Sequence, residues 1–460
     1  MKILVAIASY GTKNRHHLER LLAEYSGMAF DIDIVVLSEA PKNLGPGIEV
    51  RVGLPIPNPY SLPFAHRTLF AERADQYDLF IYTEDDTLIT ERNIHAFMQA
   101  SEQVASNELP GFLRAESAAD GSLIFECMHS AYRWLPGSVC HRQGVRFAEF
   151  SNAHAACTLL TRDQLGLAIK SGGFVVEPHE GRYRVLETAA TDAYTQCGFR
   201  KLIPIEGLRD FVVLHLANKY VGQWGMREAD VELQLQAMCD IESQVGSTGS
   251  LLLPESPVPG GKWWKDLYAT EDFAVKSLVP DHSRNILVIG VGNGEAEAQL
   301  LSSDRRVTVM PIDPIFARCC EARNLVVLGG GFDDPGLQAM SFDCVILPNV
   351  LQLVNNPEEL LQRVSGLLSP GGSVVCSIPS LPDKSRPNRL RRKTPAVFTA
   401  TKALYWRHRM EFRARRWFAR ASYRVDPIMV SGFDSSTRSG LRKLGAAPQL
   451  SFRLVPQTAN

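Results

Sequence analysis

Residues 78–91 read Asp-Leu-Phe-Ile-Tyr-Thr-Glu-Asp-Asp-Thr-Leu-Ile-Thr-Glu, an apolar run that meets three consecutive acids. The apolar residues 79–82 predict a buried strand, which places Glu84, Asp85 and Asp86 at its end. Three adjacent carboxylates repel one another and lose hydration near a core, unless a cation offsets both costs. Glu84 and Asp86 can bind a divalent ion together, and an ion held by few carboxylates usually also binds substrate phosphates. The alternative interpretation is a solvated acidic turn.

The segments before this acidic strand predict an alternating α/β arrangement. Residues 3–8 and 32–37 are apolar runs that predict two more strands, and residues 64–77 predict a helix that leads into the acidic strand. Residues 41–63 hold six prolines and predict a loop. This order resembles the nucleotide-sugar-binding half of GT-A glycosyltransferases, over roughly residues 1–225.

The resemblance implies a metal ion and a nucleotide-sugar donor at the ends of these strands. In GT-A enzymes a short acidic motif holds the metal ion on the donor diphosphate, and the variant here is Glu84-x-Asp86. A late histidine often supplies a third ligand, which implies His215 as a ligand of Mn²⁺ or Mg²⁺. The alternative for His215 is a core histidine in an apolar strand. The implied donor-binding residues are Ser9, Tyr10, Glu39, Arg67 and Asp85. The alternative for Arg67 is a side chain in solvent.

The segment 186–194 carries the candidate general base. Inverting GT-A enzymes often place a carboxylate at a helix start here, which implies Asp192 as the base, with Glu187 as the second choice. Such a base must be ionised and within hydrogen-bond reach of the acceptor hydroxyl. The alternative for Asp192 is a helix cap without a role in chemistry.

Length and composition indicate an ordinary globular chain with more than one domain. The 460 residues are 45% hydrophobic and 22% charged, and two to three domains are expected for this length. We find no signal pattern and no apolar run that could span a bilayer. The nine cysteines show no metal-like spacing and predict buried free thiols in a reducing compartment. We expect a cytoplasmic protein.

The composition changes at residues 246–261, which are rich in Gly, Ser and Pro and predict a linker. We therefore expect two α/β domains: a GT-A-like domain over residues 1–245 and a second domain over residues 282–460. Residues 246–281 would form the linker and a docking helix.

The second domain begins with a strand that enters a glycine-rich turn, Gly290-Val291-Gly292-Asn293-Gly294. Its glycines let a cofactor approach the backbone, and the next strand ends at Asp313, where an acid can bind both ribose hydroxyls. The order of elements over residues 284–380 resembles class I S-adenosylmethionine-dependent methyltransferases. The implied cofactor-binding residues are Gly290, Gly292, Gly294, Asp313, Asp333 or Asp334 at the adenine, and Asn349 beside the sulfonium.

Two departures from the methyltransferase pattern leave an inactive scaffold open as an alternative. Val288 stands where these enzymes usually have an acid near the methionine amino group. Gln352-Leu353 stands where many relatives have Glu-His.

Residues 383–424 hold 14 Lys or Arg against 2 Asp or Glu, although the net charge of the chain is −1. On a helical wheel Trp406, Met410, Ala414, Trp417, Phe418 and Ala421 share a face with arginines around it. Such a helix suits peripheral contact with an anionic membrane. The alternatives are a lid that packs on the domain, or a solvated face. No aromatic-interleaved strand supports nucleic acid binding, so none is expected.

We therefore expect a bifunctional enzyme that transfers a sugar from a nucleotide sugar to a glycan or lipid-linked glycan and methylates a hydroxyl of the glycan. The first alternative is a glycosyltransferase whose second domain only binds or localises. A nucleotidyltransferase would carry a glycine-rich signature after the first strand, which Ser9-Tyr10-Gly11-Thr12 does not resemble. A non-catalytic glycan- or membrane-binding protein would leave the clustered acids without a purpose.

Overall fold

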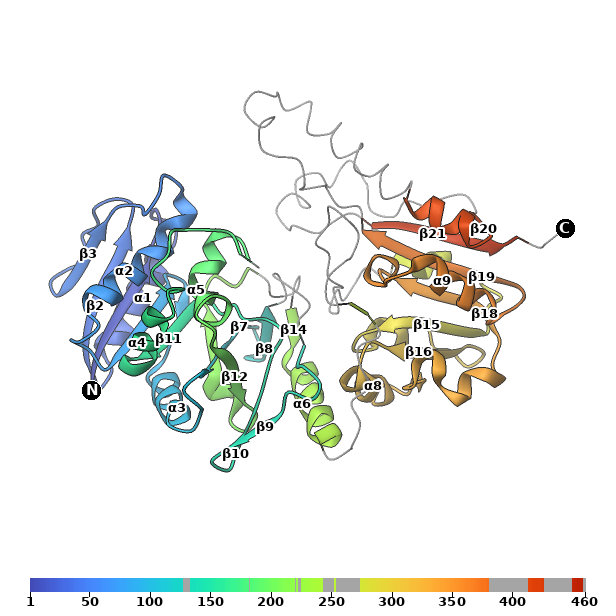
Figure 1. Cartoon of the computed structure of the whole chain (residues 1–460), viewed down its shortest axis with the longest axis horizontal. Helices are drawn as coiled ribbons and strands as arrows, with labels where there is room; N and C mark the ends of the chain where they lie inside the picture. Colours follow the sequence, from blue (N-terminus) through green and yellow to red (C-terminus); the bar gives the residue numbers. More distant parts are fainter. Residues whose placement is uncertain are drawn as a thin grey trace, which may run out of the picture. The chain divides into compact units, whose positions relative to one another are not determined.

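The structure, a computed structural model, divides the chain into two compact units, Met1–Met238 and Cys239–Asn460 (Figure 1). The residues that it describes are 1–126, 133–181, 183–219, 221, 225–242, 252–253, 274–379, 413–425 and 449–457. The expected linker and docking helix, residues 246–281, lie largely outside them, so the expected domain boundaries stay predictions.

The first unit is built on a sheet with the strand order β11-β4-β1-β2-β3. Its strands are β1 (Lys2–Ala8), β2 (Asp31–Ser38), β3 (Ile48–Val52), β4 (Leu79–Glu84) and β11 (Cys157–Thr161). The four strands β4, β1, β2 and β3 are parallel to one another, and β11 runs antiparallel to β4. β1 and β4 are almost wholly buried, as expected for central parallel strands covered on both faces.

The strand β3 and a 3-10 helix, η1 (Pro59–Phe64), lie where we predicted only a loop. β3 pairs with β2 in parallel at the edge of the sheet. The prolines of residues 41–63 flank this short strand and do not enter it, so they remove none of its ladder hydrogen bonds.

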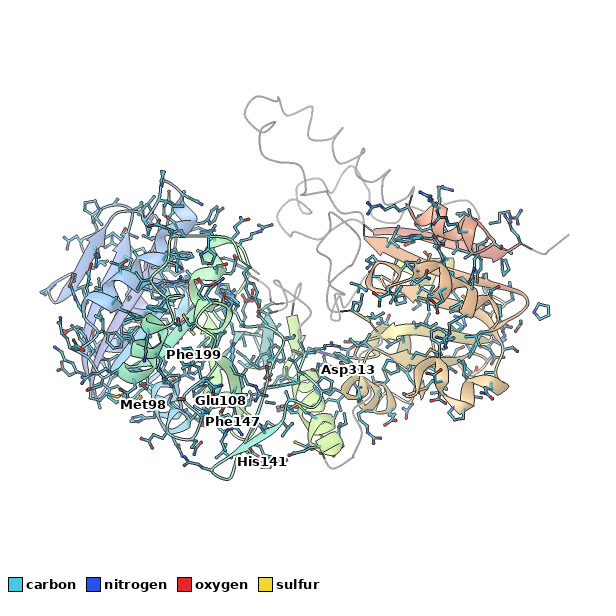
Figure 2. The ribbon with its side chains drawn as sticks, in the orientation of Figure 1. Met98, Glu108, His141, Phe147, Phe199 and Asp313 are labelled. Carbon is cyan, nitrogen blue, oxygen red and sulfur yellow. The ribbon has the colours of Figure 1, made fainter. Side chains whose placement is uncertain are left out.

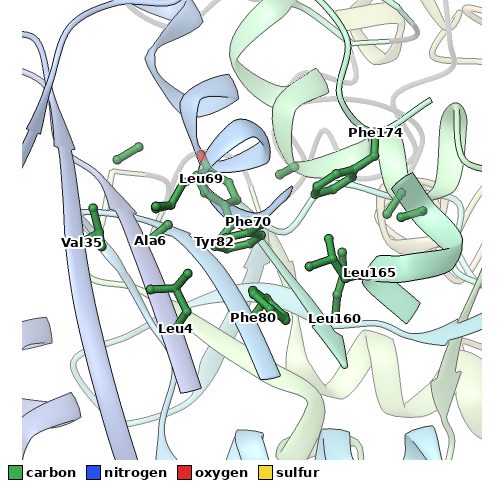
Figure 3. Packing of buried hydrophobic residues seen from close by; sticks show 14 of the residues in the cluster. Leu4, Ala6, Val35, Leu69, Phe70, Phe80, Tyr82, Leu160, Leu165 and Phe174 are labelled. Atoms are coloured by element: carbon green, nitrogen blue, oxygen red, sulfur yellow. The ribbon is translucent and has the colours of Figure 1, made fainter. Parts of the chain in front are cut away.

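Helices pack on this sheet through one apolar cluster, which includes Leu69 and Phe70 of α2, Leu165 of α4, and Phe80 and Tyr82 of β4 (Figure 3). The helices of the chain's first half are α1 (Arg15–Ser26), α2 (Ala65–Glu72), α3 (Glu91–Ser101), α4 (Arg162–Lys170), α5 (Val185–Thr195) and α6 (Glu228–Glu242). The side chains of Thr90 and Thr161 begin α3 and α4 with capping boxes, which satisfy otherwise unpaired N–H groups.

Two further sheets complete the first unit. One has the order β14-β8-β7-β13-β5, with β5 (Thr87–Leu88), β7 (Leu113–Ser117), β8 (Leu123–Glu126), β13 (Val212–His215) and β14 (Gly225–Arg227). The other has the order β6-β12-β10-β9, with β6 (Glu108–Pro110), β9 (Cys140–Arg142), β10 (Val145–Ala148) and β12 (Arg200–Pro204). Glu108 of β6 and Phe147 of β10 are marked in Figure 2. β5 follows the acidic triplet directly and pairs with β13, so the triplet joins the first sheet to the second.

The second unit contains one large sheet with the order β17-β16-β15-β18-β19-β21-β20. Its strands are β15 (Asn285–Val291), β16 (Arg306–Pro311), β17 (Val326–Val327), β18 (Phe342–Pro348), β19 (Leu368–Pro379), β20 (Tyr423–Val425) and β21 (Gln449–Pro456). The five strands β17, β16, β15, β18 and β19 are parallel to one another. β21 runs antiparallel to β19 on one side and to β20 on the other. This confirms the predicted α/β class and a Rossmann-like second half.

Short helices connect the strands of the second unit, and two of them begin with a side-chain cap. They include α7 (Glu295–Ala298), α8 (Pro314–Glu321) and α9 (Pro357–Ser365). Asp313 and Asn356 accept hydrogen bonds as the N-caps of α8 and α9, and each is followed by proline at the first helical position.

Part of the basic segment buries its apolar face within the second unit. Residues 413–420 are helical, and Ala414 and Phe418 are fully buried. The Phe418 ring packs on Phe452 with centroids 5.2 Å apart, and Arg420 pairs with Glu358 at 2.8 Å. For this part the expected membrane-facing surface is therefore wrong, because its apolar atoms pack on the domain. Residues 383–412 lie outside the described residues, so the membrane expectation stays a prediction for them. None of the helices among the described residues is both long and apolar enough to cross a bilayer.

Substitution of Gly290 by alanine should destabilise the second unit more than the same change at Gly371. Both glycines have φ +82°, a value that costs a residue with a Cβ about 1–2 kcal/mol. A Cβ at Gly290 would also lie 2.4 Å from Val350 Cγ1, whereas a Cβ at Gly371 meets nothing within 4 Å. Overpacking adds about 1–3 kcal/mol, so urea unfolding should show the larger loss in Gly290→Ala. Equal losses would contradict the packing described at Gly290.

Candidate functional site

The carboxyl edge of the first sheet contains a point where the strand order reverses. From β1 the chain adds β2 and β3 on one side and then returns to place β4 on the other side of β1. Ligands of open α/β sheets bind in the crevice beyond the carboxyl ends of the strands at such a point. Ser9 follows β1, and the acidic triplet begins at Glu84, the last residue of β4, so both lie at this position.

The turn after β1 is held by two side chains that follow β2. The Lys42 ammonium donates to the carbonyl and hydroxyl oxygens of Ser9 at 2.9 and 2.8 Å and to the Gly11 carbonyl at 2.6 Å. The Gly11 N–H donates to Glu39 Oε1 at 3.0 Å. Tyr10 is 52% exposed at this turn. Ser9, Tyr10 and Glu39 were expected from the resemblance, whereas Lys42 was missed, because its role depends on a contact 31 residues away in the sequence.

Asp85 and Asp86 are buried and share one amide donor. Asn14, just before α1, donates from Nδ2 to Asp85 Oδ1 at 2.8 Å and to Asp86 Oδ2 at 3.1 Å. Burial raises the pKa of Asp85, and the hydrogen bond from Asn14 offsets this only in part. Burial acts in the same direction on Asp86, but His215 and Lys219 outweigh it and lower the pKa of Asp86 to about 2. Asp86 is therefore ionised at neutral pH.

His215 lies beside Asp86 because of strand register. β13 pairs with β5 so that His215 stands opposite Thr87, the residue after Asp86. Its Nε2 is 3.4 Å from Asp86 Oδ2, and its Nδ1 is 2.6 Å from Glu116 Oε1. Burial lowers the pKa of His215, but the hydrogen bonds to Asp86 and Glu116 outweigh it and raise the value.

Glu116 is a functional candidate that no sequence pattern indicates. It is fully buried on β7, which lies next to β13 in the sheet. Besides the His215 ring, it accepts the backbone N–H groups of Lys219 and Val221, each at 2.8 Å. Because a carboxylate can only accept, Nδ1 of His215 carries the proton in this contact. No local pattern marks Glu116, since its partners lie about 100 residues later in the chain.

Glu84 does not join Asp86 and His215 in a metal-binding set. Among the described residues no three His, Cys, Asp or Glu side chains are arranged to hold a metal ion. β4 ends at Glu84, and the turn that follows breaks the alternation that would have placed Glu84 and Asp86 on one face. The Glu84 Oε1 atom is buried without a hydrogen-bond partner, and burial raises the pKa of Glu84 to about 8.

Arg67 and Asp192 form a buried ion pair. Their side chains are 2% and 1% exposed, with Arg67 Nη1 2.8 Å from Asp192 Oδ2. Arg67 also donates to the carbonyls of Phe174, Thr188 and Ala189, so it ties α2 to α5. The alternative of an Arg67 in solvent is wrong, because the fold buries this face of α2. Its donor contact stays a prediction.

The expected place of Asp192 at a helix start is also wrong. α5 begins at Val185, so Asp192 lies near its end, and Glu187 lies in its first turn. Glu187 is half-buried, and its charge contributes to the raised pKa of Glu84. Of the two candidate bases, Glu187 is therefore the one near the acidic triplet and partly open to solvent.

The second unit reverses its strand order between β15 and β18. The glycine turn follows β15, and Gly290 and Gly294 adopt φ values of +82° and +81°, which favour glycine. The Gly292 carbonyl accepts from Cys320 Sγ at 3.4 Å. Asn349 follows β18 with φ +53°, and its Oδ1 is buried without a hydrogen-bond partner. The predicted cofactor loop and Asn349 thus flank the position where this fold class binds ligands.

Three predicted acids follow β16 and β17. Asp313, labelled in Figure 2, is buried and accepts the Phe316 N–H at 3.1 Å. Asp334 accepts the Gly330 and Gly336 N–H groups at 3.1 and 2.9 Å. The Asp333 side chain is 97% exposed. These contacts leave the cofactor roles of all three as predictions.

Comparison with known proteins supports the assignment of the second unit. Residues 287–376 match a family model described as a methyltransferase domain. The chain is 30% identical over 105 residues to the reducing polyketide synthase Preu2 of Preussia isomera, and this match covers 20% of the chain and 4% of the synthase. The chain thus spans a small fraction of this curated relative.

Solved structures that match part of this chain include an S-adenosylmethionine-dependent methyltransferase from Mesorhizobium loti, at 16% identity over 39% of this chain and 95% of that one, with a TM-score of 0.31. Another is an O-methyltransferase family protein from Burkholderia thailandensis, at 16% identity over 40% of this chain and 56% of that one, with a TM-score of 0.27. The family match lies wholly within the second unit.

Loss of the buried ion pair should destabilise the first unit far more than loss of a surface pair. Arg67→Met leaves Asp192 charged in the core, which costs about 3–5 kcal/mol. The control is Arg15→Met, which removes an exposed pair with Glu19 on α1 and should cost under about 0.5 kcal/mol. Chemical denaturation of both variants measures the difference. Similar losses would contradict the structural role of Arg67.

Proposed function

We propose that the second unit transfers a methyl group from S-adenosylmethionine, and that the first unit transfers a sugar from a nucleotide sugar to a glycan or lipid-linked glycan. One observation carries both assignments: in each unit, residues predicted to bind the ligand follow the two strands between which the strand order reverses. For the second unit, the match to a methyltransferase domain supports the same assignment.

The residues of the second unit fit a bound S-adenosylmethionine, which supplies an activated methyl group. Gly290 and Gly294 keep the turn after β15 free of side chains, and Asp313 stands after β16, where an acid can bind ribose hydroxyls. The unpartnered Asn349 Oδ1 offers an acceptor for a donor group of the cofactor or of the methyl acceptor. Methyl transfer to oxygen depends mainly on alignment, which a rigid parallel sheet supplies.

In the first unit, Asp86 and His215 fit a divalent ion that would neutralise the departing nucleoside diphosphate. Asp86 is ionised, and Glu116 accepts from Nδ1 of His215, which directs Nε2 toward Asp86. Two protein ligands are enough for an ion that also binds substrate phosphates. We assign Glu84 no ligand role, because it does not join the pair.

The remaining residues at this edge bind the donor and activate the acceptor. Ser9, Tyr10 and Glu39 stand at the turn beside the donor position, with Lys42 holding the turn in place. We assign the general-base role to Glu187, because Asp192 already neutralises Arg67 inside the core. Asp85 remains a donor contact in this proposal.

The alternative for the second unit is a domain that binds or localises without catalysis. Val288 is fully buried in β15 among core residues, so no acid reaches the cofactor from that position. Under this alternative, residues 383–412 would provide the contact with an anionic membrane that the sequence predicts.

Nucleotide binding in the first unit should depend on metal and on Asp86. Thermal unfolding is measured with UDP, GDP, dTDP and CDP, each with and without Mn²⁺. A nucleotide at a hundred times its dissociation constant should stabilise the first unit by about 2.7 kcal/mol. Asp86→Asn should remove this effect, whereas Glu19→Gln, which removes an exposed carboxylate of α1, should not. The sugar-transfer proposal fails if no nucleotide stabilises the wild type in the presence of metal.

Asn349→Gly should weaken S-adenosylmethionine binding, as measured by titration calorimetry. Glycine accepts the positive φ of Asn349 without strain and removes the short side chain with its carboxamide, so one lost hydrogen bond should reduce affinity by about 2–10-fold. Asn324→Gly is the matched control, because Asn324 also has a positive φ, of 61°, and lies exposed after α8. A wild type that binds no S-adenosylmethionine would favour the non-catalytic alternative.

A further inference from the structure

One oxygen of Asp86 is approached by three nitrogen atoms. Oδ2 lies 3.1 Å from Asn14 Nδ2, 3.4 Å from His215 Nε2 and 3.5 Å from Lys219 Nζ. Asn14 is neutral, and the His215 ring is fixed on its other side by Glu116. The Lys219 ammonium is therefore the mobile charge at this oxygen.

The backbone near Lys219 is held in place, whereas its side chain is partly free. The Leu216 N–H donates to the Asp86 carbonyl, and the Lys219 and Val221 N–H groups donate to Glu116, all at 2.8 Å. The Lys219 side chain is 45% exposed, although Asp86 is 6% exposed in its side chain. The ammonium thus reaches a buried carboxylate from the surface, and it can leave without moving the backbone.

Resting on the proposed function of the first unit, we propose that Lys219 is a counter-ion of Asp86 that a divalent metal ion displaces and that then binds the donor diphosphate. A divalent ion bound at Asp86 repels the ammonium at this distance, so the two cations exclude each other. Lys219 is a flexible point charge with three donors, and phosphate oxygens on the same ion lie within its reach.

If this exchange occurs, removal of the Lys219 ammonium should change the affinities for the metal ion and for the nucleotide in opposite directions. Without nucleotide, the loss of a competing cation strengthens metal binding. With metal in place, the loss of a phosphate-binding cation weakens nucleotide binding. A general loss of structure at residues 216–221 would weaken both.

The experiment compares Lys219→Met with the wild type in the full chain. Binding of Mn²⁺ alone is measured by electron paramagnetic resonance of the free ion. Lys219→Met should bind Mn²⁺ about 3–10-fold more tightly, the scale of one close unit charge screened by bulk water, because the Lys219 side chain is 45% exposed. Binding of UDP, GDP, dTDP and CDP is then measured at saturating Mn²⁺, and the nucleotide that binds should lose about 10-fold or more, the scale of a hydrogen bond to a charged group.

Two further variants separate this contact from general electrostatics. Lys13→Met removes an exposed positive charge between β1 and α1 and should leave both affinities within about 2-fold, because exposed charges without contact are screened. Lys219→Arg keeps the charge and should stay between the wild type and Lys219→Met in both measurements.

The outcomes distinguish this inference from the proposed function beneath it. If the wild type binds nucleotide with Mn²⁺ but Lys219→Met matches it, or loses affinity for both ligands, the exchange is wrong and the sugar-transfer site stands. If the wild type binds neither Mn²⁺ nor nucleotide, both proposals are overturned. Only opposite changes in the two affinities support the exchange.

Discussion

The first unit is organised around the ionised carboxylate of Asp86, which lies just after the buried strand β4. β4 runs through the core between β1 and β11, and the turn that follows it holds the carboxylates of Asp85 and Asp86 in a nearly dry position. An ionised carboxylate there requires donors, because unpaired buried charge costs several kcal/mol. Asn14, His215 and Lys219 supply them from three different segments. The carboxylate of Asp86 thereby fixes the relative positions of the start of α1, the end of β13 and the segment after it.

The same requirement explains the second layer of contacts. The Nε2 atom of His215 faces Asp86, so its Nδ1–H needs a separate acceptor in the core. Glu116 of β7 accepts this hydrogen bond. Glu116 is itself satisfied by two backbone N–H groups, so no charge in this chain of contacts is left without a partner. Arg67 and Asp192 solve the same problem elsewhere, as a pair that closes α2 on α5 without contact to the acidic triplet. Buried charge thus serves two purposes in this unit: the Arg67–Asp192 pair joins two helices, and the contacts of Asp86 lead to the half-exposed ammonium of Lys219.

How far the sequence could predict these features depends on the separation of the residues involved. Strands such as β1, β4 and β15 were predicted because continuous apolar runs reflect burial on both faces, which is a local property. β3 was missed because prolines nearby concealed a short edge strand. The glycine turn was named from a local pattern and Asn349 from the resemblance to methyltransferases, and the sheet order brings them to one edge. Glu116 and Lys42 could not be named, because their roles depend on β7–β13 pairing and on a contact across the β1 turn. Asp192 was misplaced because nothing local showed that α5 begins seven residues earlier.

Each unit also contains a polar group that breaks the rules of a stable core. Glu84 Oε1 and Asn349 Oδ1 are buried without partners, and Asn349 adopts a positive φ as well. An unpartnered atom alone identifies no site, since Tyr25 Oη in the core of the first unit is another. Glu84, however, is the last residue of β4, and Asn349 follows β18, and both strands stand where the order of their sheet reverses. Tyr25 lies on α1. Strand order and hydrogen bonding are independent criteria, because the order of the strands does not determine whether a given oxygen has a hydrogen-bond partner. At these two residues both criteria agree, so an oxygen that lacks a hydrogen-bond partner stands where a bound ligand could supply one. The missing hydrogen bond lowers the stability of the fold, and such a loss is expected at functional sites.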